Sequence, residues 1–239
     1  MRQSPAYVSI ARGSYTKLSD AVFPAADFQG PLYVVSEFNA SDGLGGTYRN
    51  QLSYSGAVVH LQGRGFQGFA TQRIEDSRNG LITFDYVARA FPHTGMHTQR
   101  TVFQADGRTR VSQWTADLAA QAAGGSGSEQ RVLPLVASTT DQRFEYGGAL
   151  NGTVITETTN AFTYGDGYGN PTLVQTHVWD TDPGSATYGS AWRSTASFSY
   201  ANDTSGNWCL GLPVSSTVTN TAPEQVAMTR ATTYVADTV

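Results

Sequence analysis

The feature that most constrains this chain is a degenerate repeat of strand-and-turn units, whose turns are built from tyrosine, aspartate, glycine and asparagine. One unit reads AFTYGDGYGNPTLVQTHVWD and contains Tyr164, Gly169 and Asn170. Another reads SFSYANDTSGNWCLGLPVSSTVT and contains Tyr200 and Asn207. Each unit is too short to bury an apolar face by itself, so we expect it to stack on neighbouring units. The repeat therefore predicts a β-sheet protein before it points to any enzyme.

The composition agrees with this expectation. Only 14% of the 239 residues are charged, and abundant threonine, serine, glycine and tyrosine favour strands and turns over helices. The net charge of −4 argues against a surface that binds nucleic acid. The single cysteine, Cys209, excludes an intrachain disulfide, and we expect it to be a small buried apolar residue.

The ends of the sequence suggest a piece of a longer protein. We find neither a transmembrane run nor a signal peptide in it, and it begins within polar, strand-like sequence. We expect an internal fragment with two parts, an irregular N-terminal segment at 1–30 and a β-repeat region at 31–239.

Turn signals place the strands of the repeat region. The pairs Asn79-Gly80 and Asp106-Gly107 tolerate the positive φ of tight hairpin turns, and Pro183 marks 180–190 as a long loop. We expect strands at 32–41, 47–55, 57–62, 66–75, 81–91, 98–104 and 108–115, and further strands from 131 onward. The alanine-rich stretch 112–123 is ambiguous, because its propensity favours a helix.

Three motifs could carry chemistry, and each lacks its context. Residues 63–68 match GxGxxG, but the dinucleotide motif needs a following helix and the next residues alternate as in a strand. His93 and His97 have a zinc-like spacing, but two further ligands are missing and Cys209 is remote in the sequence. Asp180 and Asp182 could serve as a hydrolase pair, but a solvated turn explains them better. We therefore expect no catalytic residue, no cofactor and no metal.

The aromatic residues are explained by packing. Phe66 and Phe69 flank Gly68, which predicts that a neighbouring strand or ring lies close to this glycine. Exposed aromatic side chains can also stack on sugars, so a carbohydrate-binding surface is the rival interpretation.

Two segments resemble a known family. GRGFQGFATQRIEDSRNGLITFDYVARAFPHTGM and LPLVASTTDQRFEYGGALNGTVITETTNAFTYGDGYGNPT resemble the β-repeats of Rhs/YD-repeat bacterial toxins, which include the B components of Tc insecticidal toxins and SpvB-like virulence proteins. The likeness continues through YANDTSGNWCLGLPVSSTVTNTAPEQVAMTRATTYVAD and covers about residues 30–237. The repeat positions that it marks are Gly65, Phe66, Gly68, Phe69, Tyr164, Gly169, Asn170, Tyr200, Asn207, Trp208 and Tyr234.

The resemblance implies an all-β fold, in which antiparallel β-hairpin repeats form part of a curved sheet or shell. It also implies a strand rather than a helix over 110–122. In that family the shell is a non-enzymatic container that encloses a toxic domain. The implied partners are further repeats of the same chain and the enclosed toxin domain, with possible self-association through edge strands and no nucleic acid. The implied location is outside the cell or at the bacterial surface.

Two other functions stay open. A carbohydrate- or receptor-binding β module of a bacterial surface protein is the main alternative, and it should show exposed aromatic side chains clustered on one face. An isolated hydrolase domain is a third possibility.

Overall fold

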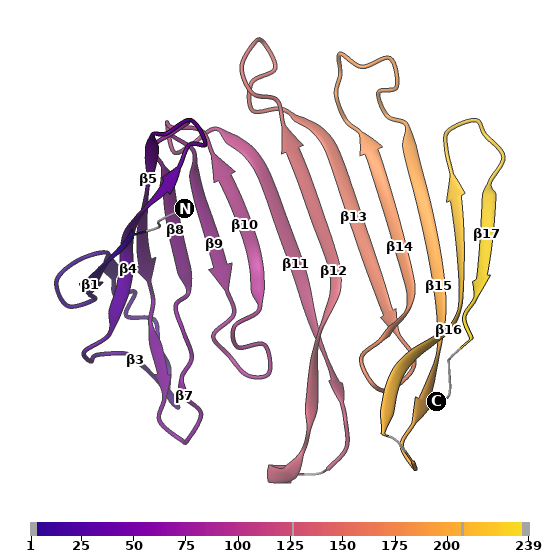
Figure 1. Ribbon diagram of the computed structural model, residues 1–239, viewed down its shortest axis with the longest axis horizontal. Helices are drawn as coiled ribbons and strands as arrows, with labels where there is room; N and C mark the ends of the chain where they lie inside the picture. Colours follow the sequence, from indigo (N-terminus) through magenta and orange to yellow (C-terminus); the bar gives the residue numbers. More distant parts are fainter. Residues whose placement is uncertain (1–3, 126, 207, 236–239) are drawn as a thin grey trace. The chain divides into compact units, whose positions relative to one another are not determined.

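The computed structural model describes residues 4–125, 127–206 and 208–235. These residues form seventeen strands, almost all of them antiparallel (Figure 1). Apart from η1, a single 3₁₀ turn at Gly127–Glu129, the described ranges contain no helix. The expected all-β, antiparallel fold is therefore confirmed. No helix in the described part of the chain has the length and apolar character needed to cross a membrane.

Two compact units divide the chain. The first holds the described residues up to Trp114 together with Tyr146–Gly152, and the second holds Thr115–Glu145 and the described residues from Thr153 onward. The boundary lies within strand β11, Arg110–Ala122. This strand confirms the assignment of 110–122 to a strand against its alanine-rich helix propensity.

Unit 1 contains two sheets. The larger sheet has the order β1-β4-β5-β8-β9-β10, all antiparallel, and β2 pairs with β5 in parallel. The smaller sheet has the antiparallel order β3-β6-β7. The bounds are β1 Ser4–Ser9, β2 Tyr15–Thr16, β3 Ala25–Asp27, β4 Tyr33–Ser41, β5 Thr47–Ser55, β6 Val58–His60, β7 Gly65–Phe66, β8 Thr71–Asp76, β9 Ile82–Val87 and β10 His97–Phe103.

Two expectations for unit 1 differ from the structure. The segment 1–30 was expected to be irregular, yet its described residues carry β1, β2 and β3. Strand β1 pairs with β4, about thirty residues away (Ser4 lies opposite Asn39), and local sequence does not encode such a partner. The single strand expected at 66–75 is divided into β7 and β8, because the backbone turns at Gly68, whose φ is +88°.

Unit 2 is a run of consecutive antiparallel hairpins. Strands β12 to β17 each pair with the next strand in the sequence, and the long loop expected at 180–190 joins β14 to β15. Contacts between these described strands are confined to sequence neighbours. The bounds are β12 Val132–Phe144, β13 Val154–Tyr164, β14 Pro171–Asp180, β15 Ala191–Asp203, β16 Cys209–Thr221 and β17 Met228–Thr233.

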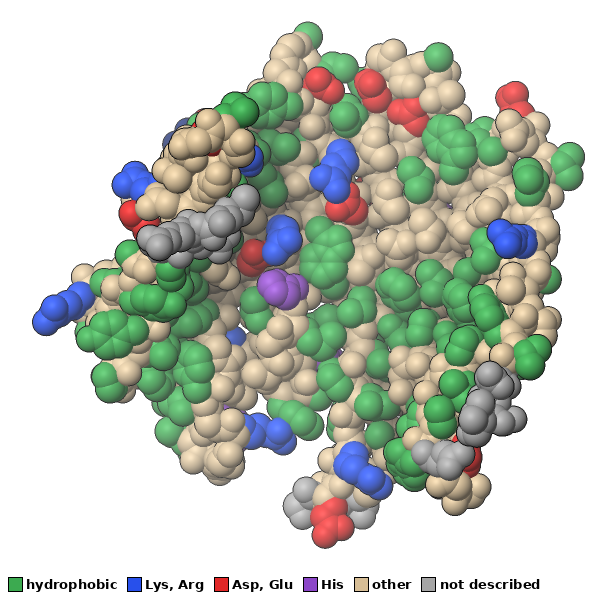
Figure 2. Space-filling view, in the orientation of Figure 1, with side chains coloured by type: hydrophobic (Ala, Val, Ile, Leu, Met, Phe, Trp, Pro, Cys, Tyr) green, Lys and Arg blue, Asp and Glu red, His purple; other side chains and the backbone are tan. Residues whose placement is uncertain are grey.

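One face of the unit 2 sheet is largely polar, whereas the other carries a polar row next to the apolar row Phe162, Val174, Ala196 and Val218. Successive residues of a strand point to opposite faces, and a polar row crosses the strands on each face. The first row is Thr140, Thr159, His177, Arg193 and Thr221, and the second is Thr139, Asn160, Thr176, Ser194 and Asn220. Figure 2 shows few charged side chains over these strands on the visible face.

Little of unit 2 is buried. Of its described residues only Phe144 and Ser216 fall in the buried class. Cross-strand hydrogen bonds take the place of a core: the Asn160 amide group donates to the Thr139 hydroxyl at 3.1 Å and its oxygen accepts from the Thr176 hydroxyl at 2.7 Å. The sheet is therefore held by its backbone ladder and by polar cross-strand pairs, and not by a layer packed on it.

Candidate functional site

The repeated tyrosines of unit 2 join neighbouring strands. The Tyr164 hydroxyl donates to the Val136 carbonyl oxygen at 2.8 Å, and the Tyr200 hydroxyl donates to the Pro171 carbonyl oxygen at 3.0 Å. Tyr234, which follows β17, places its hydroxyl 3.3 Å from the Ser216 hydroxyl. In each case the ring lies near a strand end and its hydroxyl reaches the preceding strand. The tyrosine of the repeat therefore links its strand to the preceding one through a hydrogen bond of its hydroxyl group.

The aspartate of the repeat organises the turn that follows. Asp166 Oδ1 accepts the backbone N–H groups of Tyr168 and Asn170 at 2.9 and 3.1 Å, and its other oxygen accepts from the Asn170 side-chain amide. Burial acts to raise the pKa of Asp166, but these hydrogen bonds and one from Asn202 outweigh it and lower the pKa. Gly169 completes the turn with a φ of +87°, a conformation that favours glycine.

The next hairpin repeats this arrangement. Asp203 Oδ1 accepts the backbone N–H groups of Ser205 and Gly206 at 2.9 and 3.0 Å. Asn207, a predicted repeat position, lies outside the described residues. Trp208, another predicted repeat position, is 68% exposed. Cys209 is only partly buried, which corrects the expectation of a buried thiol.

Successive turns are in contact through Asn170 and Gly211. A Cβ atom on Gly211 would lie 3.0 Å from the Asn170 Oδ1 atom, and Gly211 has a φ of +74°. The asparagine side chain therefore occupies the space that a side chain on β16 would need. Asn170 was a predicted repeat position, whereas Gly211 was missed, although a glycine inside a strand is a signal of such a close approach.

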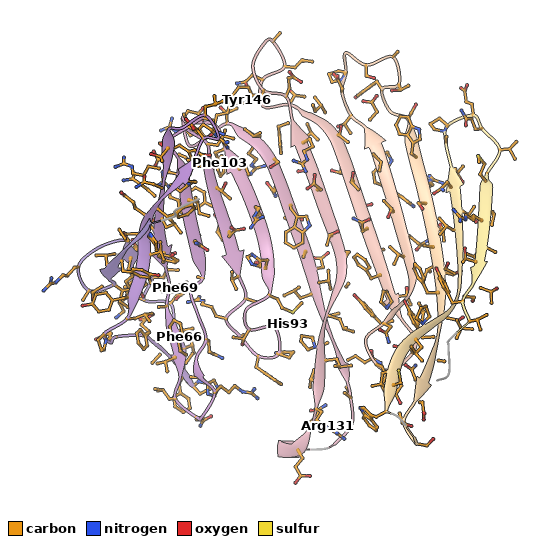
Figure 3. The ribbon with its side chains drawn as sticks, viewed as in Figure 1. Phe66, Phe69, His93, Phe103, Arg131 and Tyr146 are labelled. Carbon is orange, nitrogen blue, oxygen red and sulfur yellow. The ribbon has the colours of Figure 1, made fainter. Side chains whose placement is uncertain are left out.

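In unit 1 the predicted residues Phe66 and Phe69, labelled in Figure 3, belong to a series of contacting aromatic rings. Phe66 contacts Phe28 and Phe69, with ring centroids 5.1 and 5.8 Å apart. Phe69 also contacts Tyr54 and Tyr15, at 4.8 and 6.1 Å. Because Phe66 belongs to the smaller sheet and Tyr54 to the larger, these rings hold the two sheets of unit 1 together.

The side-chain positions of Gly68 and Gly65 are open. No heavy atom lies within 4 Å of the position that a Cβ atom on Gly68 would take, and the same is true of Gly65. A strand does lie close to Gly68, because the Val58 N–H of β6 donates to the Gly68 carbonyl oxygen at 3.2 Å, but it does not fill the space that a side chain would need. The role of Gly68 is conformational, since a φ of +88° is strained for any residue with a Cβ atom.

In strand β9 the rings of Phe84 and Tyr86 stack on one face with centroids 6.4 Å apart, and the carboxylate of Asp85 between them points to the opposite face. Asp85 is 3% exposed and accepts hydrogen bonds from Arg100 Nε and Nη2 at 2.5 and 3.1 Å. This bidentate pair joins β9 to β10 and supplies the positive charge that a buried carboxylate needs. The Asp85 Oδ1 atom also lies 3.7 Å from His97 Nδ1.

The three motifs with possible chemistry have other surroundings in the structure than their chemistry would need. Strand β8 follows the glycines of 63–68, where a dinucleotide site needs a helix. His97 contacts Asp85 rather than a metal ligand set, and Asp180 accepts hydrogen bonds from the Ser185 and Thr187 hydroxyls. Within the described ranges no three His, Cys, Asp or Glu residues group as a metal site would require.

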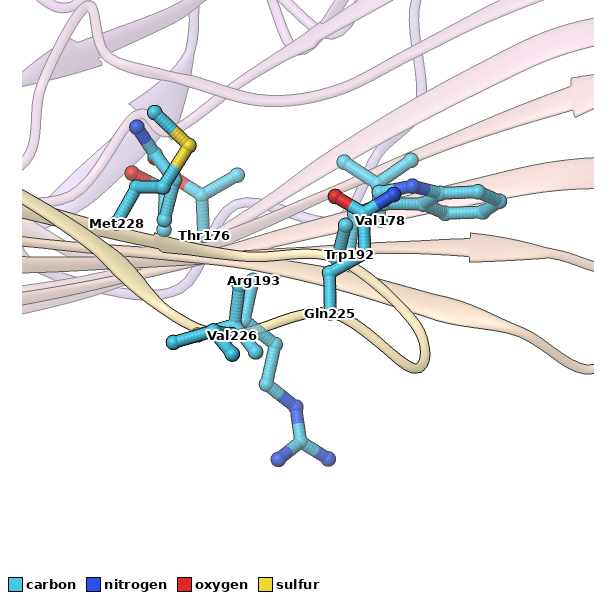
Figure 4. Close-up of a pocket in the computed structure, with 11 residues that line it drawn as sticks. Thr176, Val178, Trp192, Arg193, Gln225, Val226 and Met228 are labelled. Atoms are coloured by element: carbon cyan, nitrogen blue, oxygen red, sulfur yellow. The ribbon is translucent and has the colours of Figure 1, made fainter.

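A groove of about 290 Å³ lies at the end of unit 2 where the β16–β17 turn meets the sheet (Figure 4). Trp192, 36% exposed, and Val178 supply its apolar surface. Asn220 and Gln225 supply amide groups, and Figure 4 shows Gln225 extending toward Trp192 while Arg193 points away. The groove therefore offers one aromatic face with uncharged hydrogen-bonding groups.

Comparisons with known proteins identify a fold. No family model matches the chain, and no curated protein matches it. Solved structures that match include the crystal structures of TcdB2-TccC3-Cdc42 and TcdB2-TccC3-TEV, with TM-scores of 0.64 and 0.63 and 11% identity in each case. The matches cover 80% and 82% of this chain but only 13% of the matched chains. The chain therefore has the β fold of a part of these much longer proteins.

Proposed function

We propose that this chain is a wall segment of the β-shell of a bacterial toxin, with a structural and non-enzymatic role. The observation that carries the proposal is the sheet of unit 2, a run of consecutive antiparallel hairpins in which only Phe144 and Ser216 of the described residues are buried. The wall of a container has water or folded protein on both sides, so a sheet of this kind does not need a second layer packed over it. The likeness to TcdB2-TccC3 structures supports the same assignment.

The Tyr and Asp positions explain how such a wall could be extended. Each hairpin has its own turn-forming aspartate and a tyrosine that is hydrogen-bonded to the preceding strand. Further hairpins can therefore be added without a new hydrophobic core. The partners in this proposal are further Rhs/YD-type repeats of the same chain and a toxin domain within the shell, and its location is outside the producing cell. Self-association through edge strands belongs to the same proposal, because an unpaired edge can accept a strand.

Electron microscopy of the full-length natural gene product that contains this sequence tests the proposal. We expect residues 4–235 to form part of a closed wall with separate density inside it. A segment that projects from the particle as an independent domain would overturn the proposal. A parallel assay with glycosidase, esterase and peptidase substrates should show no turnover above that of a buffer control.

Carbohydrate binding is the second candidate function, and the Trp192 groove favours it. An aromatic face beside Asn220 and Gln225 suits a ligand with one apolar face and several hydroxyl groups. Against it, the exposed aromatic side chains of unit 2 are divided between the Tyr188–Trp192 end and the opposite turns that carry Tyr168 and Trp208. A glycan array decides: binding that is lost in Trp192→Ala and kept in Trp208→Ala would support a binding module.

A further inference from the structure

A second groove lies entirely within unit 1. It has a volume of about 480 Å³, and its walls are the segment 20–25, Val58, and the lip formed by Ala90 and Phe91. This volume is within the range of ligand sites in proteins. Most of the lining is aliphatic or aromatic, which requires an occupant with an apolar part.

Arg64 stands at this groove with its charge uncompensated. Its guanidinium carbon lies 3.6 Å from the centroid of the Phe91 ring, and within residues 4–125, 127–206 and 208–235 it forms no ion pair. A guanidinium stacked on a ring is held in one orientation and keeps its N–H edges available for an acceptor in its own plane. The geometry suits a carboxylate, which can accept two such bonds.

The other arginine of the groove is already occupied. Arg89 donates to both carboxylate oxygens of Asp20, at 3.2 and 2.6 Å, and to the Gly56 carbonyl oxygen at 2.9 Å. The hydrogen bond from Arg89 is the main cause that lowers the pKa of Asp20. The single carboxylate of the lining is thus neutralised by Arg89, and Arg64 leaves the groove with a net positive charge.

Two further donors face the same space. His60 Nδ1 accepts the Gln62 backbone N–H at 3.2 Å, so in the neutral imidazole the proton is on Nε2, which can donate. The Gln67 side chain also lines the groove, and its amide group can donate to an acceptor on a ligand.

The groove is open along one side. Of the residues that line it, Val22 is 78% exposed and Phe91 is 48% exposed. A free small molecule would be left partly in water there, whereas a polypeptide can insert two side chains while its backbone continues into solvent. We infer that this groove binds a polypeptide segment through a Glu or Asp carboxylate on Arg64 and an adjacent aliphatic side chain against Val22, Pro24 and Val58.

The inference does not depend on the proposed wall function and is tested on this chain alone. The probes are the peptide acetyl-Leu-Glu-Leu-amide, the same peptide with Gln in place of Glu, and hexanoate as a free carboxylate. Binding is measured by chemical-shift titration of isotope-labelled protein. We expect the Glu peptide to bind about tenfold more tightly than the Gln peptide, the size of one partly exposed charge-assisted contact, with shifts at Gln67 and Ala90.

Two variants separate this contact from general charge attraction. Arg64→Gln should remove the preference for Glu. Arg78→Gln should keep it, because Arg78 also lies over an aromatic ring, that of Tyr48, but is paired with Asp76. Equal binding of the two peptides, or an unchanged preference in Arg64→Gln, would overturn the inference. Hexanoate binding as tightly as the Glu peptide would overturn the assignment to a polypeptide.

Discussion

The hydroxyl group of Tyr200 donates a hydrogen bond to the backbone carbonyl oxygen of Pro171, with the two oxygen atoms 3.0 Å apart. The bond joins β15 to the first residue of β14, immediately after the turn that Asp166 organises. Tyr164 makes the equivalent bond to Val136 on β12. A sheet without a packed layer depends on such contacts more than a sheet with a core does.

Removal of this hydroxyl should therefore be measurable. We expect Tyr200→Phe to lower the free energy of unfolding by about 0.5–1.5 kcal/mol, the net contribution of one hydrogen bond. Tyr168→Phe is the control, because Tyr168 is 42% exposed and its hydroxyl has no hydrogen bond within the described part of the chain. Urea denaturation at neutral pH measures both, and equal midpoints for the two variants would contradict the role of Tyr200.

The Asp166 turn should make the stability of the protein depend on pH. The pKa of Asp166 is lowered in the folded state, so its stabilising effect is complete above the ordinary value of 3.8 and is lost as the pH falls through the folded-state pKa. In Asp166→Asn we expect a smaller loss of stability between about pH 5 and pH 2, by about 0.5 kcal/mol after solvent screening. Urea denaturation at a series of pH values measures this change of stability with pH. Glu129→Gln, a substitution at an exposed site, is the control and should leave the dependence of stability on pH unchanged.

Substitutions at Gly68 should distinguish backbone strain from lack of space. Because the site is open but has a φ of +88°, Gly68→Ala should cost about 1–2 kcal/mol of stability. Gly68→Asn should cost less, since asparagine tolerates positive φ better than alanine. Thermal or urea denaturation compares the stabilities of the two variants. A greater loss of stability in Gly68→Asn than in Gly68→Ala would mean that a neighbouring side chain limits the space at this glycine.

Because the carboxylate of Asp85 is buried, we expect the loss of its partner Arg100 to lower the stability of the protein strongly. Arg100→Met should destabilise the protein by about 2–3 kcal/mol, because it leaves Asp85 buried without positive charge; the value is moderated by water near Arg100. Arg143→Met is matched to it, since Arg143 forms an exposed pair with Asp141 at 2.9 Å, and it should cost less than about 1 kcal/mol. Similar losses for the two variants would show that burial of Asp85 carries no penalty.

Phe69 should carry much of the packing between the two sheets of unit 1. Its ring contacts Tyr15, Tyr54 and Phe66, so we expect Phe69→Ala to cost about 2–3 kcal/mol, at the lower end for a phenylalanine that is not fully buried. Phe23→Ala, at a ring that is 71% exposed, should be nearly neutral. Urea denaturation compares the two, and a neutral Phe69→Ala would show that the ring contacts add little stability.

Features of this protein that depend on residues close together in the chain could be predicted from the amino-acid sequence. The hairpins of unit 2 follow from turns whose Asp, Gly and Asn residues lie within a few positions of one another, so β13 to β16 and the 180–190 loop were predictable. Local propensity left 110–122 ambiguous, because alanine favours a helix; the resemblance to the repeats assigned it to a strand, since pairing in a sheet can override a weak propensity. Local sequence did not predict the strands within 1–30 or the division of 66–75 into β7 and β8.

Features that depend on partners far apart in the chain became visible only in the folded protein. Strand β1 finds β4, Asn170 fills the space beside Gly211, and Asp85 meets Arg100, and in each case the partner is fixed by register across the sheet and not by spacing in the sequence. Gly68 is the clearest example of a residue whose role could not be predicted from its neighbours in the sequence. Its flanking phenylalanines predicted close packing, but their rings turn toward Phe28 and Tyr54, and the glycine is needed for its backbone conformation. The groove at Arg64 likewise exists only because 20–25, 58–67 and 89–91 are brought together by folding, and no local pattern records which side chains will share a surface.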